Sequence, residues 1–219
     1  MIALFRAGKQ CVVVAVLVAL TKTLCGQPSS LPNKEIIFDQ LPLELGLSQN
    51  SINCILQDSK GFLWIGTWSG LIRYDGYSSV VYHSDNAPDK IKSDKITAIY
   101  EDHNGYLWIG TQMAGLFQYD RNTEKFSQYI HNVSDKNSLS NNNVWCVKED
   151  NHHKLWVGTE DGVNIFDRQQ KIFTVFHRNP NDPESISSDH ITDMLLSSKN
   201  EFWIATSRGI NLVEPQSNG

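Results

Sequence analysis

The stretch Gly105-Tyr-Leu-Trp-Ile-Gly-Thr111 decides the fold, because near copies of it recur along the chain at 61–67, 153–159 and 200–206. Each copy has a tryptophan at its centre, and successive tryptophans are 44, 48 and 47 residues apart. The four are Trp64, Trp108, Trp156 and Trp203. A fixed period of this length is typical of repeat architectures. We therefore expect four similar units in which each tryptophan is a buried anchor.

The similarity extends to both sides of each tryptophan. An aspartate stands six residues earlier in three copies, at Asp58, Asp102 and Asp150, and Ser197 replaces it in the fourth. A β-branched residue twelve positions earlier begins another apolar segment, at Ile52, Ile96, Val144 and Ile191. Downstream, a glycine opens a third segment, at Gly70, Gly115, Gly162 and Gly209. A fourth, aromatic segment follows only in the first three units, at 80–82, 126–129 and 173–176.

These short segments predict an all-β protein built of β-propeller blades. Each is rich in β-branched and aromatic residues and is bounded by turn residues, which is typical of strands. Four strands in 44 to 48 residues match the period of a blade of four antiparallel strands. Runs such as Leu-Trp-Ile indicate strands buried on both faces by neighbouring blades. We expect about four blades, which is a partial or small propeller.

The number of strands leaves two arrangements open. The outermost strand is missing after the fourth unit, whereas an apolar segment at 36–38 precedes the first. This segment could be the outer strand that completes the fourth blade and closes a small ring. Alternatively, it stays unpaired and the blades form an open arc with exposed edges, which favours aggregation.

The first 27 residues differ from the repeats. They carry three basic residues, no acidic residue and an apolar run at 11–20. This run is shorter than the roughly 20 residues that span a bilayer. A secretory signal peptide is therefore favoured over a retained anchor. We divide the chain into a signal peptide at 1–27 and propeller repeats at 28–219.

Charge and motifs exclude several classes of function. Without the first 27 residues the net charge falls from −5 to −8, and no basic cluster is present, which argues against nucleic-acid binding. The adjacent His152 and His153 would point to opposite faces of a strand, so we expect no metal site and no cofactor. We identify no catalytic residues. Arg121 and Arg168 follow a blade aspartate in equivalent places, and we interpret them as turn residues.

The repeated Leu-Trp-Ile-Gly-Thr and Gly-Leu-x-x-Tyr-Asp motifs resemble the two-component regulator propeller repeat, over residues 36–213. This family forms the periplasmic sensor region of bacterial hybrid two-component sensor kinases, especially those that control polysaccharide use. The resemblance implies a ligand-sensing segment in the periplasm that detects an oligosaccharide. It corresponds to a truncated N-terminal portion of such a sensor. We expect contact with the membrane only through the signal segment, if this segment is not cleaved. No kinase motif is present in this chain.

Two tryptophans that the repeat does not require are the candidate ligand-binding residues. Trp68 and Trp145 replace polar residues of the other units, and both fall near the long polar loops at 84–93, 132–143 and 179–190. A tryptophan face beside Asn and Asp suits a sugar. The alternative for both is packing against neighbouring loops.

Two other classes of function stay open. A protein-interaction scaffold is the first, and a propeller hydrolase or lyase is the less favoured second. The fold also permits self-association or association with further propeller repeats.

The cysteines of the repeats are expected to be free, buried thiols. Cys54 and Cys146 occupy equivalent places in the first and third units, where the second unit has Ala98. A whole blade would separate them, whereas a disulfide needs Cα atoms within about 7 Å.

Overall fold

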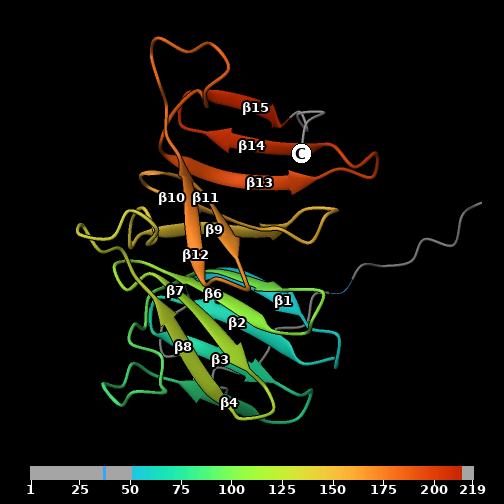
Figure 1. The fold of residues 1–219 in the computed structure, drawn as a ribbon. Coiled ribbons are helices and arrows are strands. Elements are labelled where there is room, and N and C mark those ends of the chain that lie inside the picture. The colour runs from blue at the N-terminus through green and yellow to red at the C-terminus, as the bar shows by residue number, and fades with distance from the viewer. Residues whose placement is uncertain (1–36, 38–50, 214–219) are drawn as a thin grey trace, which may run out of the picture. The chain divides into compact units, whose positions relative to one another are not determined.

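The computed structural model describes Ile37 and residues 51–213, in which every regular element is a β-strand (Figure 1). The strands form four antiparallel sheets, in each of which neighbours in sequence are also neighbours in the sheet. This confirms the predicted all-β fold of propeller blades. Among the described residues there is no helix that is long and apolar enough to cross a membrane.

The blades follow one another along the chain. Blade 1 contains β1 (Ile52–Gln57), β2 (Leu63–Thr67), β3 (Gly70–Tyr74) and β4 (Ser79–Tyr82). Blade 2 contains β5 (Ile96–Glu101), β6 (Leu107–Thr111), β7 (Leu116–Asp120) and β8 (Lys125–Tyr129). Blade 3 contains β9 (Val144–Glu149), β10 (Leu155–Thr159), β11 (Gly162–Asp167) and β12 (Ile172–Phe176). Within residues 51–213, blade 4 contains β13 (Ile191–Leu196), β14 (Phe202–Thr206) and β15 (Gly209–Val213) and no fourth strand.

The strands of residues 51–213 form an open series of blades. Extensive packing joins β1 to β5, β5 to β9 and β9 to β13, but no comparable packing joins blade 4 to blade 1. Apolar side chains are exposed at both ends, for example Ile55 of β1 (63%) and Ile210 of β15 (68%). Residues 36 and 38 lie outside the described part of the chain, as do residues 1–27. The closing strand at 36–38 and the signal peptide therefore stay predictions.

Aromatic contacts join each blade to the next. The ring centroids of Trp64 and Tyr119, on blades 1 and 2, are 5.4 Å apart, and those of Trp108 and Phe166, on blades 2 and 3, are also 5.4 Å apart. Trp156 packs on Phe202 of blade 4, with the ring centroids 4.9 Å apart, but this partner comes from the second strand of its blade rather than the third. These three tryptophans are buried, as predicted, whereas Trp203 is only partly buried. The prediction was wrong for Trp203 because no described blade follows it.

The glycine of the Trp-Ile-Gly-Thr motif lets neighbouring blades approach closely. A Cβ atom on Gly110 would lie 2.8 Å from Cγ1 of Val144, the first residue of the next innermost strand. Gly66 and Gly158 face Ile96 and Ile191 in the same way, at 2.7 and 2.6 Å. Blade 4 has Ala205 in this place. The motif therefore encodes contact between blades as well as strand structure.

The two cysteines of the repeats are free, as predicted. Cys146 is buried, as predicted, whereas Cys54 is only partly buried, so the prediction of burial was wrong for Cys54. They lie opposite Gly158 and Gly66, respectively, in the register of their sheets. Burial raises the pKa of each thiol from 9.0 to about 12, because the thiolate would lose its hydration.

We expect Trp108→Ala to lower the free energy of unfolding by about 3–5 kcal/mol, because it empties a fully buried site between blades. Trp203→Ala is the matched control and should cost less, because Trp203 already contacts solvent. Urea denaturation followed by circular dichroism measures both. Equal losses for the two variants would contradict the assignment of Trp108 to a blade interface.

We also expect the thiols of Cys54 and Cys146 to resist alkylation by iodoacetamide at about pH 8 in the native chain, since the thiolate is the reactive form. Both should react at once after denaturation in urea. Peptide mapping by mass spectrometry locates the labels at these two residues. A disulfide between Cys54 and Cys146 in the native chain would contradict the blade arrangement.

Candidate functional site

The turn between the first two strands of a blade is organised by the repeated aspartate. In blade 2, Oδ1 of Asp102 accepts hydrogen bonds from the backbone N–H groups of Asn104 and Tyr106, both at 3.0 Å. Its Oδ2 accepts one from Nε1 of Trp108 at 2.9 Å. Asp58 and Asp150 bind their own tryptophans in the same way, at 2.7 and 2.8 Å. The aspartate thus shapes the turn and also holds the tryptophan.

A carboxylate and an arginine join the first two of these turns to the next blade. Glu101 accepts hydrogen bonds from the backbone N–H and the hydroxyl of Ser59, on blade 1, both at 2.6 Å. Arg121 binds Glu101 at 2.8 Å and lies 3.2 Å from Oδ2 of Asp58. We call Asp58, Arg121 and Glu101 the first latch. It connects blades 1 and 2.

The same arrangement recurs between blades 2 and 3. Arg168 binds Oε1 of Glu149 at 2.9 Å and lies 3.4 Å from Oδ2 of Asp102. We call Asp102, Arg168 and Glu149 the second latch. The interpretation of Arg121 and Arg168 as turn residues was therefore incomplete, because each side chain reaches across to the preceding blade. Their guanidinium groups are engaged by carboxylates of the protein.

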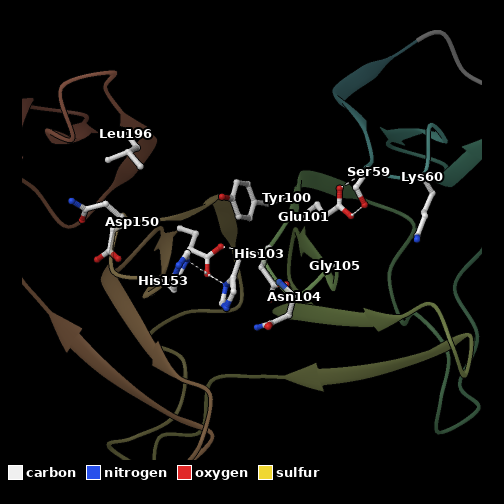
Figure 2. A pocket seen from close by; sticks show the side chains of 13 residues that line it. Ser59, Lys60, Tyr100, Glu101, His103, Asn104, Gly105, Asp150, His153 and Leu196 are labelled. Atoms are coloured by element: carbon white, nitrogen blue, oxygen red, sulfur yellow. Dashed lines mark hydrogen bonds and ion pairs between the residues drawn. The ribbon is translucent and has the colours of Figure 1, made fainter.

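A hollow of about 750 Å³ lies beside the latches, where the turns of blades 1, 2 and 3 meet. Figure 2 shows Glu101 with Ser59 on one side, Leu196 of blade 4 on the other, and His103 and His153 between them. Four acidic residues line it against one lysine, Lys60. The hollow is therefore acidic at its wall, although two arginines bind some of these carboxylates.

A cluster of two histidines and a glutamate occupies this wall. Nδ1 of His103 lies 2.5 Å from Oε1 of Glu149, and Nδ1 of His153 lies 3.8 Å from the same oxygen. The imidazole rings stack with their centroids 4.1 Å apart. Sequence reasoning considered His152 with His153 and missed this group, whose members come from two blades. The available signal was that His103 and His153 replace Ser59 and Gly61 of the first repeat.

A second, smaller hollow of about 420 Å³ lies at the opposite ends of the strands. It is lined by Trp68, Ser84, residues 92–95 and residues 112–114. The turn between β2 and β3 and the loop that enters β5 thus meet, as predicted. Met113 is exposed here at a φ of 74°, in a turn of blade 2 that is one residue longer than the others. Trp68 and Met113 give this hollow an apolar part.

The structure separates the two candidate ligand-binding tryptophans. Trp145 is on β9 and does not line the Trp68 hollow. Its ring stacks on His190, which immediately precedes blade 4, with the centroids 6.0 Å apart. Its Nε1 is buried without a hydrogen-bond partner. The ligand-binding role of both residues stays a prediction. Of the two residues, Trp68 lines one of the two hollows described above, and Trp145 lines neither.

We expect Arg121→Ala to lower the free energy of unfolding by about 3–5 kcal/mol, because it leaves two largely buried carboxylates without their cation. The side chains of Asp58 and Glu101 are only 1% and 13% exposed. Lys125→Ala is the matched control: it removes an exposed ion pair with Asp89 and should change stability little. Thermal and urea unfolding test this. A similar small effect of both variants would show that the latch does not stabilise the fold.

Comparison with known proteins identifies the repeat. Three stretches, residues 46–69, 90–113 and 138–161, match the family model described as two component regulator propeller. No curated protein is significantly similar to the chain. Two similar solved structures are extracellular domains from B. thetaiotaomicron. BT3049, described as a hybrid two component system, is 27% identical over 80% of this chain and 26% of its own, with a TM-score of 0.69.

The second, BT4673, is described as a one component system and is 22% identical over 82% of this chain and 23% of its own, with a TM-score of 0.65. This chain therefore spans about a quarter of either structure. Virginiamycin B lyase from Staphylococcus aureus is 14% identical over 76% of this chain and 57% of its own, with a TM-score of 0.51, and shares the fold alone. The chain thus carries repeats of the two-component regulator propeller family, which confirms the resemblance seen in its sequence.

Proposed function

We propose that this chain is the ligand-sensing segment of a periplasmic two-component sensor and that its ligand is an oligosaccharide bound in the Trp68 hollow. The observation that carries the proposal is this hollow, which joins an aromatic face to charged and hydroxyl groups on the loop side of the blades. The family repeat and the extracellular domains that resemble this chain support a sensory role outside the cytoplasm.

The chemistry of the hollow suits a sugar. The partly buried Trp68 ring and the exposed Met113 offer an apolar surface for the C–H face of a pyranose. Asp94 is a hydrogen-bond acceptor, and Lys92 and Lys95 are donors for hydroxyl groups. Ser84 donates to Asp94 from its N–H and its hydroxyl, at 2.7 and 2.9 Å, which joins the two ends of the loop and fixes the carboxylate.

The contacts of Trp145 favour the packing role instead. Its stacking on His190 lies at the junction of blades 3 and 4, where loss of the ring would leave a gap. Trp145 is therefore a useful control for Trp68, because the two residues are the same type and both are outside the repeat.

Two observations disfavour an enzyme. The similarity to virginiamycin B lyase extends to the fold only. A clamp for a substrate carboxylate needs free guanidinium groups, whereas Arg121 and Arg168 are bound in the latches. A protein-interaction scaffold is the remaining alternative, and it predicts no stabilisation by small glycans.

We expect one or more members of an oligosaccharide panel to raise the melting temperature, since a ligand that binds only the native chain stabilises it. Trp68→Ala should weaken this binding by about 1–3 kcal/mol, the value of burying a large apolar face, with little change in the melting temperature of the free protein. Trp145→Ala should lower the melting temperature and leave the affinity nearly unchanged.

Calorimetry on the three proteins distinguishes the outcomes. If no glycan stabilises the wild-type chain, the carbohydrate assignment is wrong and the scaffold alternative is favoured. If a glycan binds Trp68→Ala as tightly as wild type, the ligand is correct but the site is not.

A further inference from the structure

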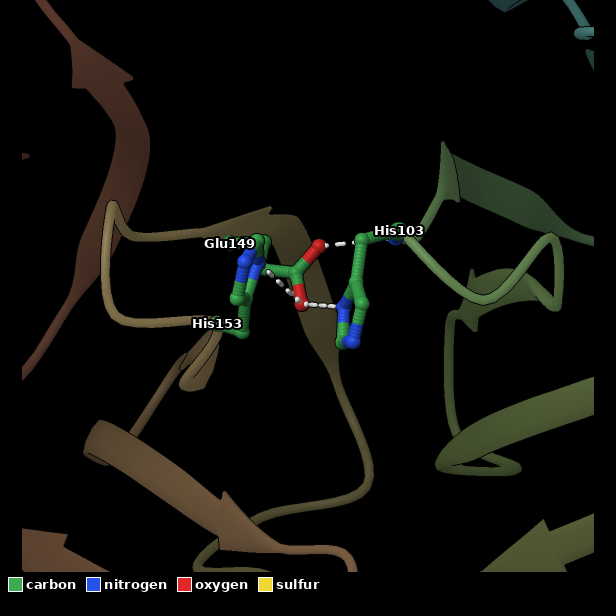
Figure 3. A group of neighbouring side chains, drawn as sticks. All are labelled: His103, Glu149 and His153. Atoms are coloured by element: carbon green, nitrogen blue, oxygen red, sulfur yellow. Dashed lines mark hydrogen bonds and ion pairs between the residues drawn. The ribbon is translucent and has the colours of Figure 1, made fainter.

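We propose that His103, Glu149 and His153 bind a divalent transition-metal ion, for which Zn²⁺ is the best match. Figure 3 shows the three side chains converging from two neighbouring blades. One ligand atom of each, a ring nitrogen of both histidines and a carboxylate oxygen of Glu149, lies within 4.8 Å of the other two. Two imidazoles with one carboxylate are a ligand set that Zn²⁺ commonly uses, with a fourth position left for water.

The distances between the three ligand atoms fit a zinc ion if the side chains move slightly. Zinc lies about 2.0–2.2 Å from nitrogen and oxygen ligands, so ligand atoms around it are roughly 3.3 Å apart. The present distances to Oε1 of Glu149, 2.5 Å from His103 and 3.8 Å from His153, lie on either side of this value. Both histidines are exposed to the hollow, whereas the Glu149 side chain is only 5% exposed. The movable ligands are therefore the imidazoles, around a fixed carboxylate.

The other repeats show that the fold does not require these histidines. In the first latch, Ser59 makes the contacts to Glu101 that His103 makes to Glu149, including the bond from its backbone N–H. His153 has a φ of 61° in a place where the first two repeats have Gly61 and Gly105, also at positive φ. A left-handed conformation is uncommon for residues other than glycine. Serine and glycine thus satisfy the same architecture.

The carboxylate is held in place while the ring nitrogen beside it stays able to bind an ion. Nδ1 of His103 would bind the ion through its lone pair, in the tautomer of the neutral imidazole that carries its hydrogen on Nε2. Arg168 donates to Oε1 at 2.9 Å, and the backbone N–H of His103 donates to Oε2 at 2.9 Å. These two bonds fix the carboxylate. The positive charge of Arg168 opposes the ion, while Asp102 and Asp150 in the same wall attract it.

The test uses the full chain without a histidine tag, titrated with a zinc salt in an isothermal calorimeter. Wild type should bind Zn²⁺ at this cluster and gain melting temperature. His103→Ser and His153→Gly restore the residues of the first repeat, so both variants keep the turn and the latch. Each should weaken binding at least about tenfold, because even partners outside a metal's ligand set cost that much. Mg²⁺ should not bind here, since it prefers oxygen ligands.

Two controls separate this cluster from other histidines. His152→Ser changes the neighbour of His153, which is outside the cluster. His177→Ala removes the imidazole of a second group, Asp161, His177 and Asp189, which lies at the surface near the start of β11. Both controls should leave the affinity of the first site unchanged.

The proposal is wrong if wild type binds no zinc. It is also wrong if His103→Ser and His153→Gly bind zinc as tightly as wild type, or if binding is lost in His152→Ser or His177→Ala instead. His153→Gly should melt at or above the temperature of metal-free wild type, because glycine adopts the left-handed conformation freely. A folded variant is thus available for the comparison.

Discussion

The hydrogen bond between a turn aspartate and the indole N–H six residues later is the interaction on which the rest of the structure depends. This bond gives the indole N–H a partner. Without it, a tryptophan packed between two blades would bury an unpaired polar group, which costs free energy. The other oxygen of the same carboxylate shapes the turn that joins the first two strands. One side chain therefore fixes both the strand connection and the ring that packs on the next blade.

Charged side chains hold neighbouring blades together at the same turns. Each latch uses a glutamate at the end of an innermost strand and an arginine after the third strand of one blade, together with the turn aspartate of the blade before it, so it forms only between adjacent blades. Blade 4 lacks the aspartate, the motif glycine and the glutamate, having Ser197, Ala205 and Leu196 in their places. Ser197 and Ala205 belong to the face that no described blade covers, whereas Leu196 takes the place of a latch glutamate at the junction of blades 3 and 4. Blade 4 therefore differs from the other blades on both of its faces.

The two hollows lie at opposite ends of the strands and differ in chemistry. At the loop end, Trp68 and Met113 add apolar surface to a charged rim. At the turn end, carboxylates and imidazoles dominate, and the latches hold them in place. Because the latches belong to the junctions between blades, an ion bound at His103, Glu149 and His153 would stiffen the contact of blades 2 and 3.

The sequence by itself determined the fold class, the number of blades and the first residue of each innermost strand, because a pattern repeated in four copies reports local structure that every copy shares. It also determined that Cys54 and Cys146 stay apart, since equivalent places in a repeat are separated by a whole blade. What only the tertiary structure decided lies between blades. Arg121 reaches Asp58, and His103 meets a glutamate 46 residues later. It also decided that Trp68 lines a hollow, whereas Trp145 stacks on His190. These contacts depend on how side chains of neighbouring repeats face one another, and the spacing of residues along one chain does not contain that orientation.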